Sequence, residues 1–201
     1  ELKSLDDVKG VRFRTPGLGG RVWEKLGATV TNMAAGEIFQ ALQSGTLDAA
    51  EFVGPYNDLA LGFHQVAKNY YMPSFVESGL ATELVVDKKK YQELPENLQA
   101  IIRDVSQAEY DQVAADFYAN DPRALKTLQE EHGVTVRNFP DDIMEAGAKA
   151  SVEVVEELRN SDDPLVKKTA DSFVEALNLV RTRTENIDSP YVQARQKFLK
   201  Y

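Results

Sequence analysis

The amino-acid sequence predicts an α/β fold in which a parallel sheet is followed by a long helical tail. Between residues 11 and 53, short β-like runs alternate with helical patterns. This rhythm is typical of parallel strands joined by crossover helices. From Pro95 onward, apolar residues recur at helical spacing instead. A chain of 201 residues, 43% of them hydrophobic, is long enough to bury a core around such elements.

The elements of the first half are read from glycine stops and from apolar patterns. At 11–14, apolar and basic residues alternate, so we expect a strand with Arg12 and Arg14 on the face opposite Phe13. Glycines end the neighbouring patterns: Gly10, Gly27, Gly45 and Gly54. The elements expected, in chain order, are a capped turn at 4–7, a strand at 11–14, a helix near 20–26, a strand at 28–31, a helix near 38–44, a strand at 47–53, a helix at 59–66, an extended run at 70–72 and a strand at 80–86.

Helices dominate the second half. An apolar stripe begins after Pro95, and Asp121-Pro122 is expected to break or restart that helix. A short strand is expected at 134–137, after Gly133. Two more helical stripes run through 143–158 and 166–180, and a last short helix starts at about Pro190.

Composition excludes several classes of function. The chain carries 23 Lys and Arg against 32 Asp and Glu, a formal net charge of −9. This balance argues against nucleic acid or an anionic membrane surface as the main partner, because both require a basic footprint. No apolar run approaches the roughly 18 residues of a membrane span. The absence of cysteine excludes thiol catalysis, disulfides and Cys-based zinc sites.

The usual catalytic motifs are missing from the sequence. It contains no Gly-x-Ser-x-Gly elbow, no His-Glu-x-x-His helix and no Walker loop. The glycines at 17–20 lack the third glycine of a dinucleotide fingerprint, because Val22 occupies that position. His132, at a predicted helix end, and His64, on a helical face, are both interpreted as structural.

Two charged groups at strand ends point to a ligand. Asp48 and Glu51 lie in an otherwise apolar run, and Glu51 is near its C-terminal end, where ligands gather in open parallel sheets. A partly buried carboxylate there must find a cation, a metal or hydrogen-bond donors. Arg14 also ends a strand, just before a glycine-rich turn into a helix, where its planar fork suits an organic carboxylate. The residues alone therefore predict a site for a small anion, without visible catalytic machinery.

A longer pattern carries a resemblance to a known family. The runs RTPGLGG at 14–20, LGA at 26–28 and GEIFQALQSGTLDAAEFVGP at 36–55 resemble the solute-binding P subunit of tripartite ATP-independent periplasmic (TRAP) transporters. The continuation through LGF at 61–63 and YYMP at 70–73 is similar to the branch that binds 2-oxo acids and related monocarboxylates. The resemblance covers essentially the whole chain.

The resemblance implies a two-lobed, periplasmic-binding-protein-like clamshell with long C-terminal helices. Residues 1–53 would belong to lobe two, 54–90 would return to lobe one, and 91–201 would be mainly helical and brace both lobes. P subunits are considerably longer, and this chain starts with Glu1-Leu2-Lys3, without an initiator Met or a signal peptide. We therefore expect a fragment in which the N-terminal part of lobe one is missing.

The resemblance also implies a site and partners. Arg14 would pair with the solute carboxylate, and Glu51 would contribute to a metal site that bridges the solute. Phe52 stands where tryptophan is common and would offer its backbone carbonyl, and Glu77 would be a further acidic ligand. The cation would be sodium or calcium, as befits oxygen ligands. The protein would be periplasmic, deliver a 2-oxo or 2-hydroxy acid to the TRAP membrane subunits, and form a homodimer through its C-terminal helices.

Two other classes of function stay open at this point. One is a metal-assisted enzyme that acts on a 2-oxo acid with Glu51 and Glu77. The other is an interaction or sensory module that binds no solute. Product analysis with 2-oxo acids separates the enzyme from a carrier, and stabilisation by a solute separates the carrier from the module.

Overall fold

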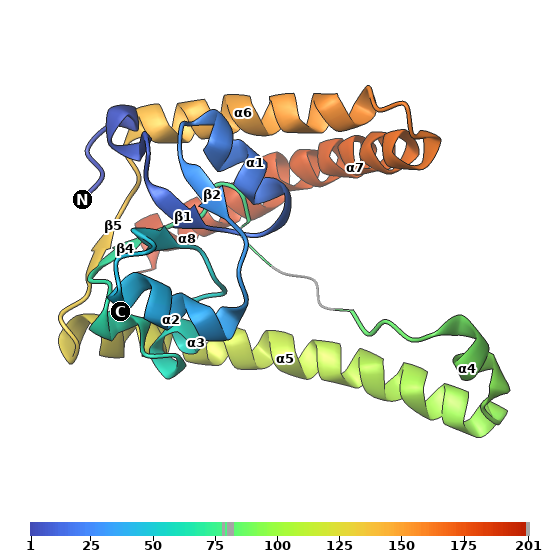
Figure 1. Ribbon diagram of the computed structural model, residues 1–201. Coiled ribbons are helices and arrows are strands. Elements are labelled where there is room, and N and C mark those ends of the chain that lie inside the picture. Colours follow the sequence, from blue (N-terminus) through green and yellow to red (C-terminus); the bar gives the residue numbers. More distant parts are fainter. Residues whose placement is uncertain (78, 80–82, 200–201) are drawn as a thin grey trace. The chain divides into compact units, whose positions relative to one another are not determined.

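The computed structural model describes residues 1–77, 79 and 83–199 (Figure 1). Within it the chain forms two compact units, Glu1–Ala150 and Ser151–Tyr201.

The first unit contains the predicted parallel sheet. Its strands lie in the order β2-β1-β3, with both neighbours parallel to β1. The strands and the helices that connect them are β1 (Arg12–Arg14), α1 (Gly17–Lys25), β2 (Thr29–Thr31), α2 (Ala35–Gln43) and β3 (Ala49–Ala50). The β-α-β-α-β prediction is thus confirmed, although the third strand is much shorter than the expected 47–53.

Backbone conformation and close packing together explain the glycines at the start of α1. Gly17 has a φ of +62°, a conformation that L side chains rarely adopt. A Cβ atom on Gly20 would lie 3.0 Å from Val30 Cγ1, so glycine lets α1 approach β2 closely. A Cβ atom on Gly19 would lie 3.4 Å from Val76 Cγ2, which places the segment around residue 76 against the first turn of α1.

A second, two-stranded parallel sheet pairs β4 (Asn69–Tyr71) with β5 (Thr135–Arg137). The chain reaches β4 through α3 (Pro55–Ala60) and the 3₁₀ turn η2 (Phe63–Gln65). This corrects the single helix expected at 59–66. The helical segment begins earlier, with Pro55 at its first position, and Gly62, with a φ of +72°, separates the two pieces.

The long helix α5 (Glu96–Glu130) follows α4 (Lys88–Glu93). The expected break at Asp121-Pro122 is wrong, because Pro122 lies inside this one helix. Proline withholds a donor from the carbonyl four residues earlier. That residue, Tyr118, is 87% exposed, so water can satisfy its carbonyl. Ala124 and Leu128, both buried, anchor the helix beyond the proline.

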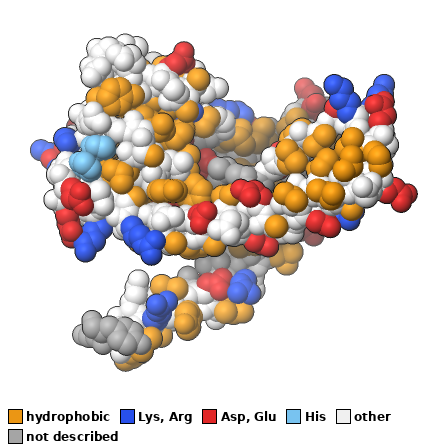
Figure 2. All heavy atoms as spheres, turned by 90° about the horizontal axis from the view of Figure 1, so that it is seen from below, with side chains coloured by type: hydrophobic (Ala, Val, Ile, Leu, Met, Phe, Trp, Pro, Cys, Tyr) orange, Lys and Arg blue, Asp and Glu red, His pale blue; other side chains and the backbone are white. Residues whose placement is uncertain are grey.

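Of the strand expected at 80–86, only residues 83–86 fall within the described part of the chain, and they are not a strand. Residues 80–82 lie outside the described residues. A strand needs a hydrogen-bonding neighbour, and neither sheet of the described chain extends to this segment. Leu84 and Val85 are 63% and 81% exposed. Figure 2 shows apolar side chains gathered on the surface over α4 and the first part of α5.

The C-terminal helices are α6 (Asp141–Arg159), α7 (Pro164–Arg183) and α8 (Ser189–Phe198), with a π-helical turn, η3 (Thr184–Asp188), between the last two. Asp163 caps α7 by accepting hydrogen bonds from the Leu165 and Val166 amides, as the sequence predicts. Within residues 1–77, 79 and 83–199, no helix is long and apolar enough to cross a membrane.

An aromatic cluster forms much of the core beside the sheet. Trp23 of α1 is its centre, with ring centroids 4.7 Å from Phe13, 5.0 Å from Phe75 and 5.8 Å from Phe139. Phe13 and Trp23 are buried, and Val8, Ile38 and Leu47 of the same unit are buried as well. The cluster fixes Phe75, and with it the chain that leads to Glu77.

Candidate functional site

A cavity of about 830 Å³ opens in the first unit, and three of the predicted site residues line it. Glu51 and Phe52 directly follow β3, and Glu77 follows β4 after six residues. The carboxyl ends of the two parallel sheets thus bring the two glutamates to one cavity. Sequence reasoning placed Glu51 there for the same reason.

Arg14, the fourth predicted residue, lies next to Glu51 but is not among the described residues that line the cavity. β1 and β3 pair in register at Arg14 and Ala50, which sets Arg14 beside the chain at Glu51. Its Nη1 donates to the Glu51 carbonyl at 2.8 Å and its Nε to the Met33 carbonyl at 3.2 Å. The guanidinium carbon is 5.8 Å from the Phe52 ring centroid.

The burial of Arg14 corrects the expectation that β1 alternates. Arg14 is only 8% exposed, although it shares the nominal outer face with Arg12. Backbone carbonyls compensate its desolvation, which is the condition for burying a charge. A positive charge is therefore held below the surface, next to Glu51.

The two glutamates repel each other across the site. Burial raises the pKa of Glu51, and the nearby charge of Glu77 raises it further, while Arg14 acts in the opposite direction. The Thr15 hydroxyl also approaches Glu51 Oε2, at 3.4 Å. A cation bound between the carboxylates would relieve this repulsion.

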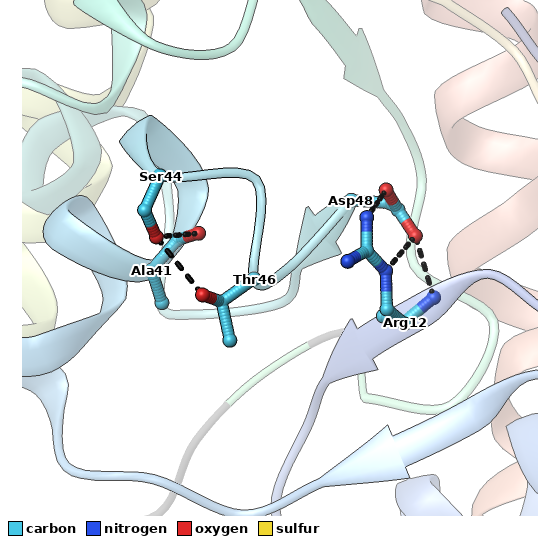
Figure 3. Close-up of polar contacts among 5 residues, drawn as sticks. All are labelled: Arg12, Ala41, Ser44, Thr46 and Asp48. Carbon is cyan, nitrogen blue, oxygen red and sulfur yellow. Dashed lines mark hydrogen bonds and ion pairs between the residues drawn. The ribbon is translucent and has the colours of Figure 1, made fainter.

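Asp48, the other acid of this segment, has a structural partner instead. Its carboxylate accepts hydrogen bonds from the Arg12 backbone amide and from the Arg12 guanidinium, in a paired arrangement (Figure 3). These bonds lower the pKa of Asp48 to about 2. Nearby, the Ser44 hydroxyl bonds to the Ala41 carbonyl and to Thr46, which closes the turn from α2 (Figure 3). Asp48 thus ties β3 to β1.

The two histidines stack on each other, and His64 also lines the cavity. Their ring centroids are 4.0 Å apart at an interplanar angle of 26°. Burial, followed by the charges of His132 and Lys68, lowers the pKa of His64. The prediction that neither histidine serves a ligand is not tested by this geometry, but the stack gives both a structural role.

Sequence reasoning missed a buried acid on the same cavity. Asp58 of α3 is 8% exposed, and its Oδ2 accepts a hydrogen bond of 2.6 Å from the Tyr70 hydroxyl of β4. Burial, together with the charge of Asp121, raises the pKa of Asp58 to about 6. A single acid near a helix start is ordinary in sequence, and only its apolar neighbours Leu59 and Leu61 hinted at burial.

The donor set suits a hard cation that is completed by other ligands. Among the described residues, no group of three or more His, Asp or Glu side chains is arranged to hold a metal. The predicted set differs from such a group, because it consists of two carboxylates and the Phe52 carbonyl. Oxygen donors of this kind suit sodium or calcium, and a carboxylate solute would add further oxygens.

Comparison with known proteins gives a consistent result. The model of the family "bacterial extracellular solute-binding protein, family 7" matches residues 1–162. A monocarboxylate 2-oxoacid-binding periplasmic protein of Nostoc sp. is 35% identical over 162 residues, which are 81% of this chain and 44% of that protein. The chain therefore spans less than half the length of this curated relative.

Solved structures agree with this match in fold. A TRAP periplasmic solute-binding protein of Colwellia psychrerythraea, with bound calcium and pyruvate, aligns with a TM-score of 0.81 at 33% identity over 96% of this chain and 58% of that one. A second, of Pseudoalteromonas atlantica with sodium and pyruvate, aligns with a TM-score of 0.82 at 32% identity over 96% and 59%.

Proposed function

The chain belongs to family 7 of the bacterial extracellular solute-binding proteins, and we propose that it captures a small 2-oxo or 2-hydroxy carboxylate for a TRAP transporter. The observation that carries the proposal is the meeting of Glu51, Phe52 and Glu77 on one cavity, with the buried Arg14 beside Glu51. The relatives from Nostoc, Colwellia and Pseudoalteromonas, which bind 2-oxo acids by name or hold pyruvate, support the same class of solute.

Each residue has a distinct part in the proposed site. Arg14 supplies a fixed positive charge and a planar fork that orients the solute carboxylate. Glu51 and Glu77 supply side-chain oxygens, and Phe52 its backbone carbonyl, to a sodium or calcium ion. Calcium would balance the charges of both glutamates and sodium that of one, and either ion would accept oxygen atoms of the solute as further ligands. The Phe52 ring packs edge-on against Phe63, with ring centroids 5.7 Å apart.

We extend the proposal to the whole protein. Residues 1–53 belong to lobe two, 54–90 return to lobe one, and 91–201 brace both lobes. The intact protein resides in the periplasm and delivers its solute to the TRAP membrane subunits. It dimerises through its C-terminal helices, which present exposed apolar side chains such as Phe173 and Leu177.

Arginine substitution tests the role of Arg14. We expect Arg14→Ala to weaken pyruvate binding by about 2–5 kcal/mol, the usual cost of removing one partner of a buried charge pair. Isothermal titration calorimetry of the intact protein with pyruvate, in calcium and in sodium buffers, measures the loss. Arg12→Ala is the matched control, because Arg12 lies two residues away on the same strand and pairs with Asp48 instead.

The outcomes separate the possible errors. Wild-type affinity in Arg14→Ala removes this residue from the solute site. If no pyruvate-like acid binds to the wild type in either buffer, the proposed solute class is wrong. The family consists of solute-binding proteins rather than enzymes, and no observation favours the alternative of a metal-assisted enzyme.

A further inference from the structure

Asp58 and Tyr70 connect the two chain segments that lead to the candidate metal ligands. Asp58 lies on α3, three residues after Pro55 opens that helix and six after Phe52. Tyr70 lies on β4, seven residues before Glu77. The hydrogen bond of 2.6 Å between them joins two chain segments, 51–58 and 70–77. Glu51 and Glu77 lie at the far ends of these segments. All of these residues line the same cavity.

Each side of this connection is attached to a different part of the unit. β4 pairs with β5, with Tyr70 opposite Val136. α3 packs on α5, where the Asp121 carboxylate accepts a hydrogen bond of 3.0 Å from the Tyr56 amide. Among the described residues, the Asp58–Tyr70 bond is the side-chain hydrogen bond that joins α3 directly to β4.

The burial of Asp58 requires an explanation that stability does not provide. Its Oδ1 is buried without a hydrogen-bond partner, and the side chain faces the Asp121 charge on α5. An apolar residue at this position would avoid the desolvation of a carboxylate. A polar group retained at such a cost is typical of a site where geometry matters for function.

We propose that Asp58 and Tyr70 are positioning residues. They hold segment 70–77 against segment 51–58, and so set the distance between Glu77 and Glu51, across which a cation is bound. The inference rests on the proposed metal and solute site. Neither side chain contacts the cation in this scheme. The Tyr70 hydroxyl acts through Asp58, and the pair acts through the two chain segments.

Three variants separate the hydrogen bond from the charge. Tyr70→Phe removes the donor and keeps the ring, and Asp58→Ala removes the acceptor. Asp58→Asn removes the charge but keeps an oxygen that accepts from Tyr70. We expect the first two to weaken calcium binding about tenfold, the lower end of the range for outer partners of a metal site. The Asp58→Asn variant should retain affinity within about threefold, since it preserves the bond.

The measurement is calorimetric titration of calcium chloride into the intact protein, with and without saturating pyruvate, and a parallel series with sodium chloride. Tyr91→Phe is the matched control, because its hydroxyl donates to the Gln99 carbonyl at 3.0 Å and does not line the cavity. Thermal unfolding of each variant shows whether it is folded. Should Asp58→Ala fail to fold, Tyr70→Phe alone decides the question.

The result that supports the inference is a loss of calcium affinity in Tyr70→Phe, affinity within about threefold of the wild type in Asp58→Asn and no loss in Tyr91→Phe. Tyr70→Phe and Asp58→Ala combined should be no weaker than either alone, because they break one bond. Wild-type calcium affinity in Tyr70→Phe overturns the positioning role and leaves the proposed function intact. If the wild type binds neither ion, the proposed metal site fails and the positioning role fails with it.

Discussion

Glu51 and Asp58 are two carboxyl groups on one cavity whose pKa values are raised, in both cases mainly by burial. Their next largest influences differ. Glu77 acts on Glu51, so part of the raised pKa of Glu51 reflects repulsion between the two carboxylates proposed as metal ligands. Asp58 is instead bonded to Tyr70, and its raised pKa describes the cost of burying a structural carboxylate. The same direction of shift therefore accompanies two different roles.

The raised pKa of Asp58 predicts how stability depends on pH. Folding raises the pKa of this group from 3.8 to about 6, so the folded protein binds the proton more tightly. The stabilisation from this proton is complete below about pH 4 and is lost as pH rises through about 6. The difference corresponds to at most about 3 kcal/mol. Asp58→Asn, which stays neutral, should therefore raise the unfolding temperature most at pH 8 and only about half as much at pH 5.

Thermal unfolding followed by circular dichroism at both pH values tests this difference. Asp111→Asn on the exposed surface of α5 is the control for removing one negative charge from a chain of net charge −9. An equal gain at pH 5 and pH 8 would show that the Asp58 charge is not the cause. An equal gain in the control would point to the net charge instead.

The segment that leads from β4 to Glu77 is held by contacts with residues distant in the sequence. Phe75, two residues before Glu77, packs on Trp23 and Phe139. On α6, Gly147 provides the room for that ring, because a Cβ atom there would clash with Phe75 Cε2. α6 thereby supports a segment of the site to which it contributes no ligand.

Gly147→Ala is expected to destabilise the protein by about 1–3 kcal/mol, the typical cost of overpacking, even though alanine favours a helix. Displacement of Phe75 should also weaken calcium binding, since Glu77 follows it. Urea unfolding and calorimetry measure the two effects. Gly36→Ala is the control, because a Cβ atom there meets no other atom within 4 Å and the position lies in the first turn of α2. A stable Gly147→Ala variant would mean that the ring moves freely.

Local signals were sufficient to predict most elements. The alternation at β1 and the glycine stops after α1 and α2 are properties of neighbouring residues, and the parallel order follows from them. Long-range effects account for the differences. Helix α5 continues past Pro122 because Ala124 and Leu128 pack beyond it, and residues 83–86 form no strand because no strand of the described chain lies beside them.

Local sequence signals also predicted part of the candidate site. Strand ends marked Arg14 and Glu51, and the resemblance to the TRAP family added Phe52 and Glu77. Asp58 and Tyr70 escaped notice because their pairing brings together residues from two elements, and neither residue type is unusual where it stands. The depth of Arg14 was also unforeseen, because alternation along a strand does not reveal what covers each face.

At the scale of the whole molecule, many apolar side chains of the second unit are exposed to solvent. On α7, Phe173, Leu177 and Val180 share one helical face at intervals of four and three residues, and they are 53%, 51% and 58% exposed. Exposed apolar stripes of this kind are typical of interaction surfaces. A symmetric dimer would bury the same stripe on both copies.

We therefore expect the intact protein to form a dimer that Phe173→Glu combined with Leu177→Glu dissociates, because the pair would place charges in an apolar interface. Light scattering coupled to size-exclusion chromatography, over a dilution series, gives the mass directly. Lys168→Glu is the control, since it reverses a charge on an exposed position of the same helix away from the stripe. A wild type with the mass of one chain at every concentration would refute the dimer. Pyruvate affinity should be the same in the dissociated variant, because every candidate ligand lies in the first unit of one chain.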